Sequence, residues 1–243
     1  MMAKKKSKQS KRNPVLVLLL VLLTMFSLLG LSFRLLLIPP ITRILAENTV
    51  NSSLSDFKHS ELVEVAEMGR AYVAGDKGAT LPEGTNEKTA YPPDVISHMD
   101  DVRYVIHMAL IATIALVVLL IISLIIAGIK AGRRTISFGL LFGGIMAVVL
   151  ALVLATIGFV NFDRLFTAMH ELFFAEGTWT FAVDSLLICT YPIEFWIGMG
   201  IVWAILLMLL SSIVSFIGYL FGRGTTRIPR QGSNTRSELV NVG

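Results

Sequence analysis

Four stretches of the chain consist almost entirely of apolar residues, and polar segments separate them. The stretches cover residues 14–38, 105–129, 136–160 and 193–220. About 20 such residues in a helix cross the hydrocarbon core of a bilayer. The pattern therefore predicts an all-α, polytopic membrane protein with four transmembrane helices, which form one domain over residues 14–221. Two long polar loops, at residues 39–104 and 161–192, interrupt this domain.

Each long loop shows a helical period of its own. In the first loop, "SELVEVAEMGRAYVAG" places its apolar residues on one stripe and ends at Gly75, a typical helix C-cap. In the second loop, six apolar side chains of "NFDRLFTAMHELFF", residues 161–174, share one broad face. This pattern predicts a helix that lies in the membrane interface. On its helical wheel His170 lies at the border between the lipid side and the water side.

The distribution of charge predicts the orientation of the chain. The tail at residues 1–13, the turn at 130–134 and the tail at 222–243 hold 13 of the 21 Lys and Arg residues, with a single acid. The two long loops hold 15 of the 17 acidic residues. Because basic segments stay on the cytoplasmic side, both tails are expected in the cytoplasm and both long loops outside. The net charge of +4 is then a topology signal and does not indicate nucleic-acid binding.

The first apolar stretch is expected to be a retained anchor, because it exceeds the short apolar region of a signal peptide and no small-residue cleavage site follows. The lone Cys189 excludes an internal disulfide and gives no lipidation site after the first span. The interiors of the last three spans carry no Asp, Glu, Lys or Arg, which argues against ion-coupled transport. Gly139 and Gly143 form a small-residue pair that allows close helix packing.

The histidines are the main candidates for chemistry. His98 and His107 are nine residues apart, which places them on opposite faces of a helix, so they cannot share a metal ion. His170 begins "HELFF", which lacks the second histidine of a zinc-hydrolase motif. A metal site built from both loops is a less favoured alternative. No G-x-S-x-G nucleophile motif occurs. The residues therefore favour general acid and base catalysis by imidazole.

Several other side chains stand near these histidines in the sequence. Asp101 is one helical turn from His98 and could fix its tautomer. Arg103 is expected to be solvated or to face lipid. Trp179 and Tyr191 are typical of the aromatic belts at membrane interfaces. His107, like His59, is expected to have a structural role.

At "HMDDVRYV" and at "NFDRLFTAMHELFFAEGTWTF...LLICTYPIEFW", the sequence resembles a bacterial family of membrane proteins, the lipoprotein intramolecular transacylases (Lit). The order of the segments agrees as well: an anchor span, an outer loop with an "ELVEVAEMGRAYVAG"-like helix, the first motif ahead of the second span, and the aromatic-rich stretch. The resemblance covers most of residues 14–221.

The resemblance implies an acyltransferase at the outer face of the bacterial cell membrane. Its substrate would be a diacylated lipoprotein whose amino-terminal cysteine carries an S-diacylglyceryl group, and membrane lipid would surround the site. The sn-2 acyl chain would move to the free α-amino group and give a lyso-form lipoprotein. The catalytic histidines of the family match His98 and His170, and no cofactor or metal is implied. Asp101, Arg103, Tyr191 and Trp179 are then candidates for supporting the reaction or binding the substrate.

Two alternatives stay open at this point. The chain could be a non-enzymatic membrane accessory or assembly factor whose outer loops bind a partner, in which case the two histidines would be dispensable. It could also be an exoplasmic lipid ester hydrolase that uses the same residues and releases a free fatty acid. The sequence does not assign the roles of base and acid to the two histidines.

Overall fold

The computed structural model describes residues 13–223 and contains eight α-helices within that range. They are α1 (Pro14–Leu36), α2 (Pro39–Thr49), α3 (His59–Ala74), α4 (Pro93–Lys130), α5 (Arg133–Val160), α6 (Phe162–Phe173), α7 (Leu186–Thr190) and α8 (Ile193–Arg223). An isolated bridge between Glu83 and Tyr91 is the sole β pairing in the described part of the chain. The all-α prediction is confirmed. The predicted basic tails lie, apart from residues 13, 222 and 223, outside the described residues.

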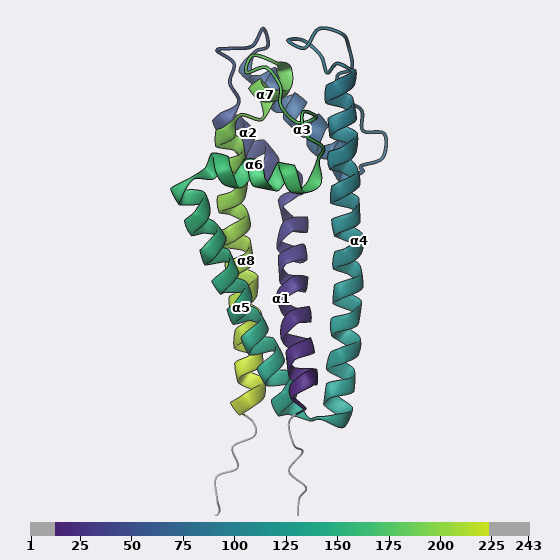
Figure 1. Cartoon of the computed structure of the whole chain (residues 1–243), viewed down its shortest axis with the longest axis vertical. Helices are drawn as coiled ribbons and strands as arrows, with labels where there is room; N and C mark the ends of the chain where they lie inside the picture. Colours follow the sequence, from purple (N-terminus) through teal and green to yellow (C-terminus); the bar gives the residue numbers. More distant parts are fainter. Residues whose placement is uncertain (1–12, 224–243) are drawn as a thin grey trace, which may run out of the picture.

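Four helices, α1, α4, α5 and α8, are long and apolar enough to cross a membrane. They form a bundle in which the start of α1 and the end of α8 lie at the same end (Figure 1). The shorter helices α2, α3, α6 and α7 gather at the opposite end and form a cap (Figure 1). The four predicted spans are therefore confirmed, and the chain is a multi-pass membrane protein.

Helix α4 extends well beyond the predicted span at 105–129, because it begins at Pro93. The fixed backbone angle of proline suits the first position of a helix, and Asp94 in the first turn complements the helix dipole. The helix then runs without interruption to Lys130. Its first turns stand beside the cap helices (Figure 1). His98 is the sixth residue of this helix.

The spans α1, α5 and α8 pack through glycines. A Cβ atom on Gly139 would collide with Leu20 of α1, and one on Gly143 would collide with Thr24. On the other side of α5, a Cβ on Gly144 would meet Ser215 and the carbonyl of Ser211 in α8. Lipid gives these helices no hydrophobic reason to associate, so close backbone approach supplies the packing. The predicted role of Gly139 and Gly143 is confirmed.

The cap has an apolar core of its own. The stripe predicted on α3 is buried, and it contacts residues from the loop before α4, from α7 and from the start of α8. Gly75 ends α3 in the left-handed conformation, with φ of 78°, as the sequence predicts. Helices α2 and α7 are not predicted from the sequence. The paired prolines at the start of α2 resemble a chain break, although a proline also initiates a helix, and α7 has only five residues.

A buried arginine joins the cap to the first span. The guanidinium of Arg70 on α3 donates to Glu67, to Asp76 at 2.7 Å and to the carbonyl of Leu37 at 3.1 Å. Leu37 is the C-cap of α1. A buried charge is tolerated where it is paired and hydrogen-bonded, so Arg70 connects the end of α1 with α3 and the turn that follows α3.

The two long loops also bind each other. Lys88 of the first loop forms an ion pair with Asp184 of the second, with a distance of 2.8 Å from Nζ to Oδ2. The amide of Leu186 donates to the carbonyl of Glu87 at 2.7 Å. These contacts hold the segment between α6 and α7 against the loop that precedes α4.

We predict that Gly143→Ala destabilises the bundle by about 1–3 kcal/mol, as an added methyl group does in a well-packed core. Its Cβ would lie 2.9 Å from the carbonyl oxygen of Val21 and would force α1 and α5 apart. Thermal unfolding of the detergent-solubilised protein measures the effect. Gly128→Ala is the matched control, because its Cβ would lie 3.8 Å from its nearest neighbour, the Cδ1 of Ile136. Equal unfolding temperatures for the two variants would contradict the packing described above.

Candidate functional site

Two histidines that are distant in the sequence meet where the cap joins the bundle. His98 comes from the first turns of α4 and His170 from the last turn of α6. Their ring centroids are 6.3 Å apart, with an angle of 20° between the ring planes. Each side chain is only 7% exposed. The structure therefore brings together the two residues that the family resemblance implicates.

The local sequence explains how α6 reaches this position. Asn161 ends α5 and caps α6, since its side chain accepts a hydrogen bond from the amide of Arg164 at 2.9 Å. Helix α6 then runs across the bundle at the end that carries the cap (Figure 1). Leu172 and Phe173 on α6 are exposed, as expected for an interfacial helix. The helical wheel placed His170 at the lipid–water border, whereas packing against α4 and the following loop buries it.

The hydrogen bond of His170 defines its tautomer. Nδ1 lies 2.9 Å from the carbonyl oxygen of Phe166, one turn earlier on α6. Because a carbonyl oxygen only accepts, Nδ1 carries the hydrogen, and Nε2 of the neutral ring has a free lone pair. Burial lowers the pKa of His170, and the hydrogen bond to Phe166 opposes this by a smaller amount. The ring is therefore neutral at neutral pH, with a basic nitrogen available.

His98 has a different environment. Its Nδ1 is buried and has no hydrogen-bond partner in residues 13–223. The rings of Phe174 and Phe181 contact it, with centroid distances of 5.1 Å and 5.5 Å. Asp101 is exposed, and no hydrogen bond joins its side chain to His98 within the same residues. His98 is thus a buried imidazole whose Nδ1 is unpaired within the described residues.

Aromatic side chains enclose both imidazoles. The ring of His170 lies 4.0 Å from that of Phe166, 5.0 Å from that of Trp179 and 5.5 Å from that of Phe174. Phe166 in turn contacts Trp196 at the start of α8. We call the two histidines and the rings that contact them the aromatic cage; its members are His98, Phe166, His170, Phe174, Trp179 and Phe181. Such a site favours apolar substrate groups and limits access of water.

Arg103 and His107 face another part of the cap. The guanidinium of Arg103 lies 4.8 Å from the ring centroid of Tyr72 on α3, and the hydroxyl of Tyr72 donates to Asp100. His107 packs against Gly75, where a Cβ would lie 2.6 Å from its Nε2. These residues hold α4 against α3. The prediction that His107 has a packing role on the opposite face from His98 is confirmed.

Tyr191 is also occupied within the cap. Its hydroxyl donates to the carbonyl of Ala66 on α3 at 2.7 Å, and a Cβ on Gly69 would collide with it. Burial raises the pKa of Tyr191 well above its ordinary value. The side chain is therefore a neutral link between α3 and the segment before α8.

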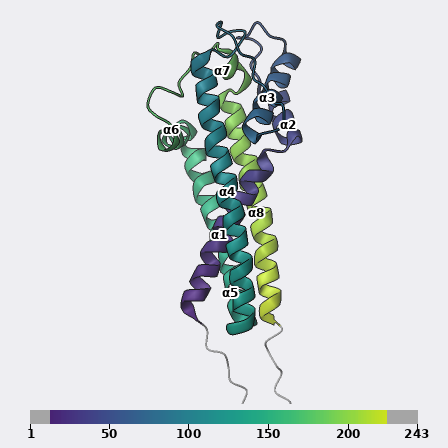
Figure 2. The same ribbon diagram turned by 90° about the vertical axis from the view of Figure 1, so that its right-hand side faces the viewer.

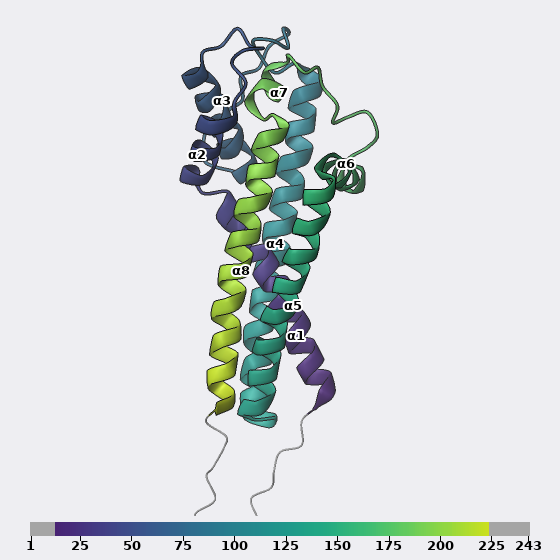
Figure 3. The ribbon, with the colours of Figure 1, turned by 90° about the vertical axis from the view of Figure 1, so that its left-hand side faces the viewer.

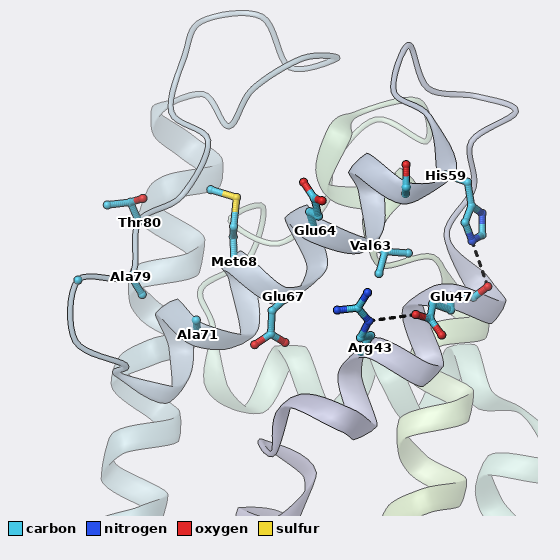
Figure 4. A pocket seen from close by; sticks show the side chains of 12 residues that line it. Arg43, Glu47, His59, Val63, Glu64, Glu67, Met68, Ala71, Ala79 and Thr80 are labelled. Atoms are coloured by element: carbon cyan, nitrogen blue, oxygen red, sulfur yellow. Dashed lines mark hydrogen bonds and ion pairs between the residues drawn. The ribbon is translucent and has the colours of Figure 1, made fainter.

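A separate cavity lies away from the histidine pair. It has a volume of about 600 Å³ and lies between α2, α3 and residues 78–80 (Figure 4). Figures 2 and 3 place α2 and α3 on the side of the bundle opposite α6. Arg43 and Glu47 at its wall pair with each other at 3.1 Å, and His59 contacts the carbonyl of Glu47. Within the described residues, no three His, Cys, Asp or Glu side chains are placed to hold a metal ion.

Comparison with known proteins gives a consistent result. A family model described as lipoprotein intramolecular transacylase Lit matches residues 15–196. The solved structure of the membrane-integral Lit from Bacillus cereus aligns with a TM-score of 0.70 and 16% identity, and covers 87% of this chain and 96% of that one. A variant of that protein with a histidine changed to arginine aligns with a TM-score of 0.65 and 17% identity, over 87% and 92% of the two chains. No curated protein matches the sequence at a significant level.

We predict that His170 is half-protonated below pH 6.5, the ordinary value for histidine, because burial disfavours its charged form. At neutral pH it should show the Nδ1–H tautomer. Nitrogen NMR of ¹⁵N-histidine-labelled protein measures both properties, and a His170→Gln sample assigns the resonance. Denaturation in SDS is the control and should return the midpoint toward 6.5. A midpoint above that value in the folded protein, or an Nε2–H tautomer, would rule out the arrangement described here.

Proposed function

We propose a reaction for this chain from the premise that it belongs to the lipoprotein intramolecular transacylase (Lit) family and is therefore an acyltransferase. It moves the sn-2 acyl chain of a lipoprotein's S-diacylglyceryl cysteine to the free α-amino group of the same cysteine. The product is a lyso-form lipoprotein. One observation carries this proposal: His98 and His170 meet in an aromatic cage, and His170 keeps a basic nitrogen free.

His170 acts as the general base. The α-amino group of a peptide has a pKa of about 8, so its neutral form, which has a free lone pair, is present in part at neutral pH. Nε2 of His170 takes one proton from this neutral amine while the amine nitrogen forms a bond to the sn-2 carbonyl carbon. The carbonyl π electrons move to the oxygen and give a tetrahedral intermediate. A positioned base of this kind contributes about 10² to 10⁴ in rate.

Collapse of the intermediate completes the transfer. The carbonyl reforms, the bond to the sn-2 glyceryl oxygen breaks, and that oxygen receives the proton that His170 took from the amine. His98 faces the same space and donates a hydrogen bond to the departing oxygen. The result is an amide and a free hydroxyl group on one molecule, with no net gain or loss of protons. The tautomer of His170 supports its role as base; the sequence alone left the two roles unassigned.

The aromatic cage favours transfer over hydrolysis. Nucleophile and ester belong to one substrate, so the protein has mainly to fold them together, which lowers the entropic part of the barrier. The rings of Phe166, Phe174 and Trp179 surround His170 and limit competing water. Asp101 and Arg103 lie outside the contacts of the cage, and we assign them, with Tyr191, a supporting role in positioning α4 and the cap.

We predict that His98→Gln and His170→Gln each lower the conversion rate by at least about 10²-fold, since each variant loses the imidazole. The chain is expressed in bacterial cells whose lipoproteins have free amino termini, and mass spectrometry locates the acyl chains on the lipopeptides. His59→Gln is the matched control, because the ring of His59 lies outside the aromatic cage and its one hydrogen-bond contact within residues 13–223 is with the carbonyl of Glu47.

Three outcomes would argue against the proposal. Unchanged lipopeptides with the wild-type chain would exclude transfer to this substrate. Release of free fatty acid in place of an N-acylated peptide would identify a hydrolase. Full conversion by both histidine variants would show that the pair is not catalytic, as expected for an accessory factor.

We also propose that the cap and the histidine pair face the outside of the cytoplasmic membrane and that both termini are cytoplasmic. The support is the charge distribution along the sequence, with basic residues before the first span, between the second and third spans and after the fourth, and with acidic residues in the two long loops. In intact cells, a membrane-impermeant thiol reagent should label Ser52→Cys in the first loop and leave Arg134→Cys unlabelled. Both positions are exposed, and Cys189 is buried. The reverse labelling pattern would place the site on the cytoplasmic side.

A further inference from the structure

Trp179 belongs to the aromatic cage, and the residues before and after it in the sequence are fixed by hydrogen bonds and an ion pair. Before it, the segment that follows α6 turns at residues 175–178, where Gly177 has a φ of 82° and both the amide and the hydroxyl of Thr178 donate to the carbonyl of Ala175. After it, the ion pair between Lys88 and Asp184 fixes the approach to α7. The segment projects from the bundle between α6 and α7 (Figure 3).

The ring nitrogen of Trp179 is a buried donor without an acceptor. Nε1 is buried and has no hydrogen-bond partner among residues 13–223. An indole N–H can only donate, so no other arrangement of its hydrogen satisfies it. A tryptophan of the membrane belt normally directs this group to water or to lipid headgroups. An unpaired buried donor is costly, and the cost is accepted where the donor has a task.

The position of the Trp179 N–H beside the two histidines indicates which group it could bind. The indole ring lies 5.0 Å from the ring of His170, with 35° between the planes. His170 keeps its Nε2 free, and the Nδ1 of the neighbouring His98 is likewise buried and unpaired within residues 13–223. Three polar nitrogens from three separate segments thus lie around one aromatic site. The imidazoles account for proton transfer, and neither is assigned to the carbonyl oxygen of the ester.

We propose that the Nε1–H of Trp179 is the oxyanion donor of this site, which rests on the acyl transfer proposed above. When the amine nitrogen bonds to the sn-2 carbonyl carbon, the π electrons move to the carbonyl oxygen, and Trp179 donates a hydrogen bond to that negative oxygen. The hydrogen stays on the indole throughout. When the carbonyl reforms, the bond to the sn-2 oxygen breaks and the hydrogen bond weakens.

This role predicts a loss that appears in kcat. A preorganised donor that acts on developing charge typically contributes about 10² to 10³ in kcat. The sharpest test replaces Trp179 by β-(3-benzothienyl)alanine, which keeps the fused ring shape and has sulfur in place of the N–H. We expect kcat to fall by about 10²-fold with KM changed by less than about threefold. Trp179→Phe should show the same direction. The assay is conversion of a synthetic diacylated lipopeptide by the full-length protein in lipid nanodiscs.

Two further measurements separate a donor from a packing role. Trp203 on α8 packs in the bundle and outside the aromatic cage, so the same analogue at Trp203 should leave kcat unchanged. A tetrahedral phosphonate analogue of the lipopeptide should bind about 10²-fold more weakly to the Trp179 variant, in parallel with its loss of kcat/KM. The thermal unfolding temperature should stay as in the wild type.

Each remaining outcome either supports or overturns the donor role. A benzothienyl variant with wild-type kcat overturns it, and the proposed acyl transfer then stands or falls with the histidine variants alone. A fall in kcat that accompanies a lower unfolding temperature, or a fall without weaker phosphonate binding, assigns Trp179 to packing and also overturns the proposal. If the histidine variants keep full activity and the Trp179 analogue still loses kcat, the donor role holds and the assignment of the base is wrong.

Discussion

The packing of this protein differs between the spans, which are surrounded by lipid, and the cap, which is packed like a soluble domain. In the bilayer, apolar surface gives the spans no reason to associate, so α1, α5 and α8 pack by backbone contact at Gly139, Gly143 and Gly144. In the cap, apolar side chains of α3 and α7 are buried together as in a soluble domain. Arg70 connects the two regimes, because its charge is satisfied by cap carboxylates and by the carbonyl that ends α1.

The histidine pair lies where these regimes meet, and this location shapes its chemistry. Burial beside aromatic rings keeps His170 neutral, and the carbonyl of Phe166 fixes which nitrogen carries the hydrogen. An acyl ester and an amine of one lipid-anchored molecule would also meet at this depth. The same low-polarity surroundings strengthen any hydrogen bond to a developing charge. The neutral state of His170 follows from this location, and the proposed substrate and the proposed donor role of Trp179 are consistent with it.

Much of the fold could be predicted from the sequence, whereas the site could be predicted only in part. Length and hydropathy define the four spans, and local periodicity defines α3 and α6, because each of these signals lies within one segment. The pairing of His98 with His170 has no such local signal; it came from resemblance to a family. The burial of His170 was missed because a helical wheel contains no information on neighbouring elements. Likewise, nothing in the residues around Trp179 reveals that its nitrogen lacks a partner.

The continuity of α4 gives the site a dependence on the membrane itself. This one helix carries His98 near its first residue and continues without interruption to Lys130 at the opposite end of the bundle, so its position is expected to follow the bilayer as a whole. Helix α6 instead rests at the lipid surface through exposed side chains such as Leu172. A thicker or thinner bilayer displaces a spanning helix and a surface helix by different amounts. We therefore expect the distance between the two histidines of the proposed site, and with it the rate of the proposed reaction, to depend on membrane thickness.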